Sequence, residues 1–331
     1  MDKIKVGVIG TGHLGNFHAK NYAQIEQAEL VGVFDVDPER SAKVAREYSV
    51  RSFSSLPDML SAVQAVSIAT VTKSHFDVAN EVIERGVHAL IEKPITETIE
   101  QAKELVDLAE RRGVKLQVGH IERFNPAILA LEQFNLNPLF IESHRLAQFN
   151  PRGSDVAVVL DLMIHDIDLI LSLVKSKVIR IAANGVAVVS ESADIANARL
   201  EFENGCVANV TASRISQNKM RKMRLFQHNA YISIDFSQGL SEVFRLVDET
   251  DPSITPTMML GKIDQGTKKR IIAYEQPEVR EVNALKYELE LFLKSIRENT
   301  EPPVTGRDGL HALEVAQQIL KTIDAQTIAM S

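Results

Sequence analysis

A glycine-rich turn directly after a short apolar run constrains this chain more than any other feature. The run Val6–Ile9 predicts a buried strand, and it leads into Gly10-x-Gly12-x-x-Gly15, where a helical pattern begins. In this spacing the first glycine permits a tight turn, the second lets a pyrophosphate approach the backbone, and the third lets the helix pack closely on the strand. The helix N-terminus adds unpaired N–H groups. The stretch therefore predicts a dinucleotide site, although glycine-rich turns that bind nothing share the pattern.

The first 120 or so residues alternate between strand and helix patterns. Strands are predicted at 4–9, 29–35, 65–69, 88–92 and 115–118, with helices at 15–24, 38–48, 56–61, 76–85 and 99–112. The strand runs lack polar–apolar alternation, as expected for strands covered on both faces. The order predicts an α/β fold with a doubly wound parallel sheet, a Rossmann domain over residues 1–123.

A different pattern follows Phe124. Helices are predicted at 126–134 and 158–174, an extended segment at 139–148, β-rich runs at 178–189, 193–203, 206–213, 223–228, 231–236 and 242–247, a long loop at 248–266, and helices at 282–298 and 308–329. Consecutive strands joined by short turns indicate a mostly antiparallel sheet. Residues 124–331 are therefore expected to form an α+β domain for substrate binding and oligomerisation, whose C-terminal helices pack back on the first domain.

Composition excludes several kinds of partner. The formal net charge of −7 argues against a nucleic-acid partner, and no apolar run is long enough to span a membrane. The first strand begins almost at Met1, which leaves no room for a signal peptide. Cys206 is the only cysteine, so no intramolecular disulfide can form, which fits a reducing cytoplasm. A cytoplasmic protein that binds neither nucleic acid nor a membrane is therefore expected.

Asp35 strengthens the dinucleotide prediction and selects the cofactor. It ends the second predicted strand, twenty positions after Gly15, where a carboxylate can accept both ribose hydroxyls. A carboxylate there repels a 2′-phosphate, and the next residue is Val36 rather than an arginine. The pattern predicts NAD rather than NADP. The alternative is that Asp35 only caps the following turn.

Two candidates for substrate contact follow predicted strands. Lys93, in Glu92-Lys93-Pro94, comes after the strand at 88–92, and ligands of open α/β sheets bind at the carboxyl ends of the strands. Its ammonium group could hold a substrate hydroxyl and stabilise alkoxide character. A surface lysine in a loop is the alternative. His120 ends the next strand, and its alternative role is packing between domains.

Acidic and basic side chains share one stretch of the predicted helix at 158–174. Asp161 and His165 are four positions apart, and Asp168 follows three positions later, so the three lie along one face. A histidine suits proton transfer from a hydroxyl, and a neighbouring carboxylate would orient it. The alternative is the solvated face of an amphipathic helix. No second cluster supports a metal site, so none is predicted.

These motifs, in this order, resemble the Gfo/Idh/MocA family of oxidoreductases over nearly the whole chain. The resemblance is carried by Gly10-x-Gly12-x-x-Gly15 with His18 and Ala19, Ile68-Ala69-Thr70 with His75, Glu92-Lys93-Pro94, Asp161-x-x-x-His165-Asp166-x-Asp168, and Glu203-Asn204-Gly205. Val71 departs from the proline that is usual in the family. The resemblance implies NAD(P)-dependent oxidation of a sugar or cyclitol hydroxyl.

The resemblance also assigns residues. It implies a catalytic group of Lys93, Asp161 and His165, and substrate contacts by His120, Arg123 and Asp168. The implied cofactor contacts are Gly10, Thr11, Gly12, His13, Leu14, Gly15, Asp35, Thr70, His75, Glu92, Lys93 and Gly119. In this hypothesis His165 takes the proton of the hydroxyl that Lys93 holds, and Asp161 orients His165 or a neighbouring hydroxyl.

One further run narrows the substrate class. Residues 119–127 resemble a subgroup of the family that oxidises C3 of UDP-N-acetylglucosamine, whose keto product an aminotransferase then aminates for cell-envelope glycans. A nucleotide sugar needs cations for its diphosphate, and the candidates are Arg123, Arg152, Arg214, Lys219, Arg221, Lys222 and Arg224. A solvated loop and strand edge is the alternative for 219–224. A free-sugar or inositol dehydrogenase, or a non-catalytic NAD-dependent sensor, remain open, and a homodimer or homotetramer is expected.

Overall fold

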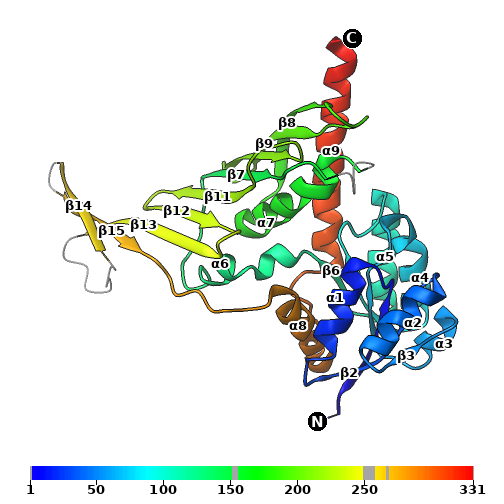
Figure 1. Cartoon of the computed structure of the whole chain (residues 1–331). Coiled ribbons are helices and arrows are strands. Elements are labelled where there is room, and N and C mark those ends of the chain that lie inside the picture. Colours follow the sequence, from blue (N-terminus) through cyan, green and yellow to red (C-terminus); the bar gives the residue numbers. More distant parts are fainter. Residues whose placement is uncertain (1, 151–155, 249–257, 266–267, 331) are drawn as a thin grey trace. The chain divides into compact units, whose positions relative to one another are not determined.

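The computed structural model describes residues 2–150, 156–248, 258–265 and 268–330 (Figure 1). By its internal contacts the chain divides into two units. The first comprises Met1–Phe124 together with Val282–Glu314, and the second comprises Asn125–Glu281 together with Val315–Ser331. The segment Val282–Glu314 thus belongs with the N-terminal unit although it comes late in the sequence.

The first unit is built on a six-stranded parallel sheet in the order β3-β2-β1-β4-β5-β6. Its strands are β1 (Ile4–Ile9), β2 (Ala28–Phe34), β3 (Arg51–Ser52), β4 (Ala65–Ile68), β5 (His88–Glu92) and β6 (Leu116–Gly119). The strand order reverses between β1 and β4, which is the point where doubly wound sheets bind dinucleotides. The predicted parallel sheet is confirmed. Only the two-residue β3 was missed, because both its residues are exposed and form no apolar run.

Helices and 3-10 turns connect these strands. They are α1 (His13–Tyr22), α2 (Pro38–Glu47), α3 (Leu56–Leu60), η1 (Thr72–Ser74), α4 (His75–Glu84), α5 (Ile99–Arg112) and η2 (Ile121–Phe124). Local capping explains where several of them begin and end. The Asp37 side chain accepts hydrogen bonds from two N–H groups at the start of α2, and Gly113 ends α5 with a φ of 66°.

Helix α8 (Ala284–Glu298) completes the core of the first unit. Its Leu289, Phe292 and Leu293 are buried in the same cluster as Val6 and Val8 of β1. An Asn283 amide that donates to Asn21 at 3.0 Å ties the start of α8 to α1. The strand and helix that flank the glycine turn are therefore packed from behind by a distant part of the sequence.

The second unit contains a nine-stranded sheet in the order β14-β15-β13-β12-β11-β7-β10-β9-β8. The strands are β7 (Phe140–Leu146), β8 (Val178–Val186), β9 (Ile195–Phe202), β10 (Val207–Ser213), β11 (Met220–Gln227), β12 (Ala230–Asp235), β13 (Leu240–Asp248), β14 (Met258–Gln265) and β15 (Lys268–Glu275). Every pair is antiparallel except β7 with β10. The predicted large, mostly antiparallel sheet is confirmed.

Two local predictions in the second unit were wrong. The loop expected at 248–266 includes a strand, β14, which pairs with β15 and extends the sheet edge (Figure 1); residues 249–257 and 266 lie outside the described residues. These strands depend on mutual pairing rather than on a strong local pattern. The helix expected at 126–134 is only α6 (Pro126–Leu129), after which the chain continues in turns.

The helix expected at 158–174 has two parts. It opens with a π-helical turn, η3 (Val159–Met163), and continues as α7 (Ile164–Val174). The wider turn alters the register, so the regular spacing assumed for Asp161 and His165 does not hold across the junction. Helix α9 (Gly306–Met330) ends the described chain, and its first turns belong to the first unit.

Candidate active site

The glycine turn after β1 has the geometry that a dinucleotide requires. Gly10 has a φ of +85°, and a Cβ on Gly15 would lie 1.8 Å from the Gly10 carbonyl oxygen, so neither position accommodates a side chain. A Cβ on Gly12 would meet nothing within 4 Å, which leaves space beside the backbone. Gly12 is the N-cap residue of α1, and no side chain there bonds to the first N–H groups of the helix. These groups therefore remain available to phosphates.

Asp35 is fixed beside this turn. Its Oδ2 accepts hydrogen bonds from the Thr11 N–H at 2.6 Å and from the Thr11 hydroxyl at 3.0 Å, and Oδ1 accepts from the Asp37 N–H at 2.9 Å. Burial by itself raises the pKa of Asp35, but the hydrogen bonds from Asp37 and Thr11 and the charge of Arg40 outweigh it and lower the pKa. The carboxylate is therefore ionised and oriented. The contact with Arg40, 3.9 Å away, was missed because no local pattern indicates it.

A cavity of about 370 Å³ lies against the turn and Asp35. Its lining includes six of the predicted cofactor contacts: Gly10, Gly12, His13, Leu14, Asp35 and Thr70. Thr11 and Gly15 do not line the cavity but support it. Thr11 donates hydrogen bonds to Asp35, and Gly15 packs closely against the backbone of the glycine turn. The residues present thus fit the adenosine and pyrophosphate parts of NAD.

A row of hydrogen-bonded, mostly buried side chains fixes the end of β5. His18 of α1 lies between Glu92 and Ser67, with Nε2 2.7 Å from the Glu92 carboxylate and Nδ1 3.0 Å from the Ser67 hydroxyl. The Ser67 hydroxyl lies 3.0 Å from the hydroxyl of Tyr22. Burial raises the pKa of Glu92, but the His18 hydrogen bond and the nearby charges, including that of Lys93, lower it overall. Glu92 is therefore a fixed carboxylate directly before Lys93.

His75 joins two loops at the same edge of the sheet. Its Nδ1 lies 2.9 Å from the Pro94 carbonyl oxygen and its Nε2 lies 3.2 Å from the Thr70 carbonyl oxygen. Burial lowers the pKa of His75, which favours the neutral ring. The loop that lines the cavity and the turn that carries Lys93 thus both contact one imidazole, whose neutral form donates to one of the two carbonyls at a time.

The end of β6 lies beside Glu92. A Cβ on Gly119 would come within 3.1 Å of the Glu92 carboxylate, so a larger residue would require this side chain to shift by a few tenths of an ångström. His120 follows and is 1% exposed. Arg123, a predicted substrate contact, lies 3.5 Å from the Asp308 carboxylate, and its side chain is 14% exposed. Much of the Arg123 charge is therefore matched within the first unit.

In the second unit, a buried ion pair anchors α7 to the sheet. Arg145 of β7 donates from Nε to Asp166 at 2.7 Å, the Ser143 hydroxyl donates to the same carboxylate at 2.9 Å, and both charged side chains are at most 3% exposed. The pair holds the first turn of α7, which carries His165. Asp168 is 1% exposed, so its side chain belongs to the interior of this unit.

Asp161 lies in the π-turn and lines a second cavity of about 280 Å³. The same cavity is lined by Gln148, Asn150, Arg214, Lys219 and Arg221. Of the predicted cation set, Lys222 and Arg224 line no part of it, and Arg152 lies outside the described residues. The structure therefore brings Asp161 together with three of the predicted cations.

No group of three or more His, Cys, Asp or Glu side chains among the described residues could hold a metal ion. No helix in the described part of the chain has the length and hydropathy needed to cross a membrane.

Known proteins match the chain along both units. Residues 4–120 match the family model described as "Oxidoreductase family, NAD-binding Rossmann fold", and residues 138–233 match the "GFO/IDH/MocA C-terminal domain". The chain is 40% identical over 326 residues to the UDP-N-acetylglucosamine 3-dehydrogenase of Acidithiobacillus ferrooxidans, covering 98% of this chain and 99% of that protein.

A solved structure and a further relative also match this chain over nearly its full length. A structure of the A. ferrooxidans enzyme matches with a TM-score of 0.88 and 39% identity, over 98% of this chain and 99% of that one. The NAD(+)-dependent scyllo-inositol 2-dehydrogenase of Bacillus subtilis is 27% identical over 332 residues, 95% of this chain and 92% of that protein. The chain belongs to the Gfo/Idh/MocA family of oxidoreductases, with NAD as its cofactor.

Proposed function

We propose that this enzyme oxidises the C3 hydroxyl of UDP-N-acetylglucosamine to a ketone. The observation that carries the proposal is the 40% identity, over nearly the full length, to a protein with that activity. The cavity that combines Asp161 with three cations supports it, because a nucleotide sugar carries its diphosphate on C1, within one sugar ring of C3. An inositol or a free sugar offers no anion to such a set of cations.

The proposed roles follow from the chemistry of each side chain. NAD, when bound, accepts the hydride from C3. The Lys93 ammonium group donates a hydrogen bond to the reacting oxygen and stabilises negative charge on it. His165 takes the hydroxyl proton, since a neutral imidazole is a suitable base near neutral pH. Asp161 orients His165 or a neighbouring sugar hydroxyl.

The remaining site assignments are part of the proposal. Glu92, His75 and Gly119 are placed at the nicotinamide end, since hydrogen bonds or close packing fix all three near the Lys93 turn. For His120, Arg123 and Asp168, the expected substrate contacts, we propose a position behind the substrate site. Their burial and the ion pair of Arg123 favour a supporting role over direct contact with a large ligand.

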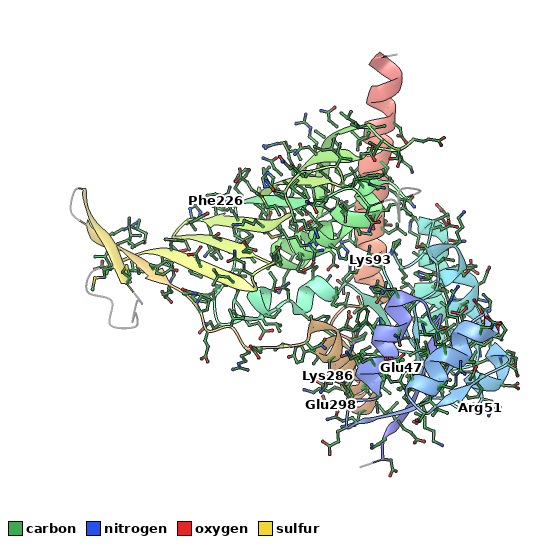
Figure 2. All side chains as sticks on the ribbon, viewed as in Figure 1. Glu47, Arg51, Lys93, Phe226, Lys286 and Glu298 are labelled. Carbon is green, nitrogen blue, oxygen red and sulfur yellow. The ribbon has the colours of Figure 1, made fainter. Side chains whose placement is uncertain are left out.

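We also propose a homodimer or homotetramer in the cytoplasm. Five rings form a row across one face of the nine-stranded sheet: Phe140, Phe226, Tyr231, Phe244 and Tyr274, with successive centroids 5.1–5.7 Å apart (Phe226 is labelled in Figure 2). All five are partly exposed, and contiguous apolar surface of this kind favours a protein partner. Light scattering tests the assembly, and cell fractionation tests the location.

The activity is tested with NAD and a panel of UDP-sugars, free hexosamines and inositols. The proposal predicts a keto product from UDP-N-acetylglucosamine, detected by mass spectrometry as a loss of two hydrogens. Adding a keto acid as oxidant covers the case in which reduced cofactor stays bound. Turnover of an inositol but of no UDP-sugar contradicts the substrate assignment and favours a cyclitol dehydrogenase.

A further inference from the structure

We propose that the cavity of about 280 Å³ in the second unit is a diphosphate-binding subsite, formed by Lys219, Arg221 and Arg214. The inference rests on the proposed function and names the part of the substrate that this unit holds. The ligand class is a nucleoside diphosphate or its sugar ester. Lys219 and Arg221 supply exposed cations, and Arg214 supplies a fixed cation at the base of the site.

The alternation of side chains along β11 separates two kinds of cation. Met223 and Leu225 are fully buried, and Arg221 lies on the same face of the strand two residues earlier. Lys219 has the same parity and comes just before the strand. Lys222 and Arg224 point to the opposite face, which is the face of the Phe226 ring. Only the first pair of cations is therefore directed toward the side of the sheet where Asp161 lies.

Local ion pairs support this distinction between the two pairs of cations. On the opposite face, Lys222 lies 3.1 Å from Asp235 and Arg224 lies 3.4 Å from Glu142, each on the neighbouring strand. Their charges are already matched. For Lys219, the structure records no ion pair within the described part of the chain. The charged side chains that line the cavity are three cations and the carboxylate of Asp161, and the cations Lys219 and Arg221 are solvent-exposed, so a diphosphate could reach them.

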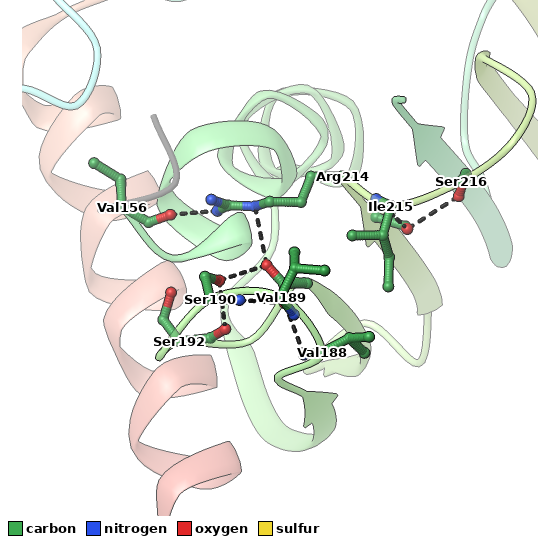
Figure 3. Close-up of polar contacts among 10 residues, drawn as sticks. Val156, Val188, Val189, Ser190, Ser192, Arg214, Ile215 and Ser216 are labelled. Atoms are coloured by element: carbon green, nitrogen blue, oxygen red, sulfur yellow. Dashed lines mark hydrogen bonds and ion pairs between the residues drawn. The ribbon is translucent and has the colours of Figure 1, made fainter. Parts of the chain in front are cut away.

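Arg214 is held in place by a second buried network (Figure 3). It follows β10 directly, is 4% exposed, and its Nε lies 3.9 Å from the Asp194 carboxylate. Its guanidinium also donates to the Val156 carbonyl oxygen. Asp194 accepts hydrogen bonds from the N–H groups of Val188 and Val189, each at 2.7 Å, and from Ser190.

This arrangement leaves Arg214 preorganised for an anion. Burial raises the pKa of Asp194, but the hydrogen bonds from the Ser190 hydroxyl and the neighbouring N–H groups lower it overall, so the carboxylate stays charged opposite Arg214. A guanidinium fixed by protein contacts loses little side-chain entropy when a phosphate binds. Asp194 is thus a positioning residue for Arg214.

The test is calorimetric titration of the NAD-loaded enzyme with UDP, which cannot be oxidised, and with uridine, which lacks phosphates. The test variant is the double substitution Lys219→Ser with Arg221→Ser. The matched control is Lys222→Ser with Arg224→Ser, which removes two cations from the opposite face of the same strand. All four side chains are solvent-accessible, so both variants are expected to fold.

The inference predicts that UDP affinity falls about ten- to hundred-fold per lost charge-assisted contact in the test variant and stays within about two-fold of wild type in the control. The affinity of the test variant for UDP should also depend much less on salt concentration than that of the wild type. The affinity for uridine should be the same in both variants. An equal loss in both variants, an unchanged affinity in the test variant, or no UDP binding by the wild type overturns the subsite.

These outcomes separate the subsite from the proposed function. Selective loss of UDP affinity together with no oxidation of any UDP-sugar keeps the subsite and rejects the C3 dehydrogenase activity. Normal oxidation of UDP-N-acetylglucosamine with unchanged KM in the Lys219→Ser, Arg221→Ser variant keeps the activity and rejects the subsite.

Discussion

Replacing His18 with Leu should loosen the turn that carries Lys93. The imidazole is fully buried, and it faces a Glu92 carboxylate that is 12% exposed at 2.7 Å. Removing the hydrogen-bond partner of a buried carboxylate leaves the charge of Glu92 uncompensated, and the loss of such a buried contact costs about 3–5 kcal/mol. The lower end, about 3 kcal/mol, is expected, since the charge of Lys93 also favours the charged form of Glu92.

The structure supplies a double-mutant cycle for this pair. Glu92→Gln removes the charge, so His18→Leu should cost less in that background, with a coupling free energy of about 1–2 kcal/mol. His18→Gln is the control, because its amide can still donate to Glu92 and accept from Ser67. The destabilisation by His18→Leu should also shrink as the pH falls from 7 toward about 5, since a buried carboxyl deprived of its donor takes up a proton more readily.

Hydrogen exchange of the NAD-loaded enzyme, followed by mass spectrometry, measures the effect locally. About 3 kcal/mol corresponds to roughly hundred-fold faster exchange in peptides from α1 and β5 if these amides exchange by local opening. The kcat for sugar oxidation should fall more than NAD affinity, because the displaced group is Lys93 rather than the glycine turn. Equal effects of Leu and Gln at position 18, or strict additivity with Glu92→Gln, would refute a positioning role for His18.

Three further predictions concern the cofactor, the chemistry and the second unit. Asp35→Ala should weaken NAD binding about ten-fold or more and NADP binding less, as measured by fluorescence titration. In the wild type, the lowered pKa of Asp35 keeps the carboxylate ionised, so NAD affinity should not fall between neutral pH and about pH 5. An unchanged preference removes Asp35 from the ribose site. Lys93→Met and His165→Asn should each reduce kcat by at least about 100-fold with little change in NAD affinity, and near-normal turnover in both rejects the catalytic assignment. Asp166→Leu should lower the free energy of unfolding by about 3–5 kcal/mol, measured in urea, because it leaves Arg145 buried without this partner; a loss below about 1 kcal/mol contradicts the anchoring role.

Local sequence patterns were sufficient for much of the first unit. The glycine turn, the apolar strands and the caps at Asp37 and Gly113 each depend on residues within one turn or strand, so their physical requirements can be read along the chain. The parallel sheet and the NAD cofactor followed from them and are confirmed. The residue-level site assignments stay predictions, as does the division at residue 123.

The features that sequence reasoning missed depend on distant residues. His18 and Glu92 are 74 positions apart, and their hydrogen bond exists only because α1 packs against β4 and β5. His18 follows Gly15 at a spacing typical of the family, but nothing in the local sequence indicates its partner. Strand β14 gains its structure from pairing with β15.

The roles of the charged residues in the second unit likewise depend on residues that are distant in sequence. Four of the seven candidate cations for the diphosphate lie at residues 219–224, and the alternation along β11 and the partners on neighbouring strands distinguish among these four only in three dimensions. The π-turn at Asp161 likewise follows no sequence pattern that was recognised.

The most direct test of the central claim is transfer of deuterium from a labelled substrate. UDP-N-acetylglucosamine deuterated at C3 is incubated with the enzyme and NAD, and the nicotinamide is released and analysed by mass spectrometry. Oxidation at C3 predicts deuterium in the reduced nicotinamide from the C3-labelled sugar and none from a C4-labelled one. Transfer from C4, or no transfer from C3 in an enzyme that binds NAD, contradicts it.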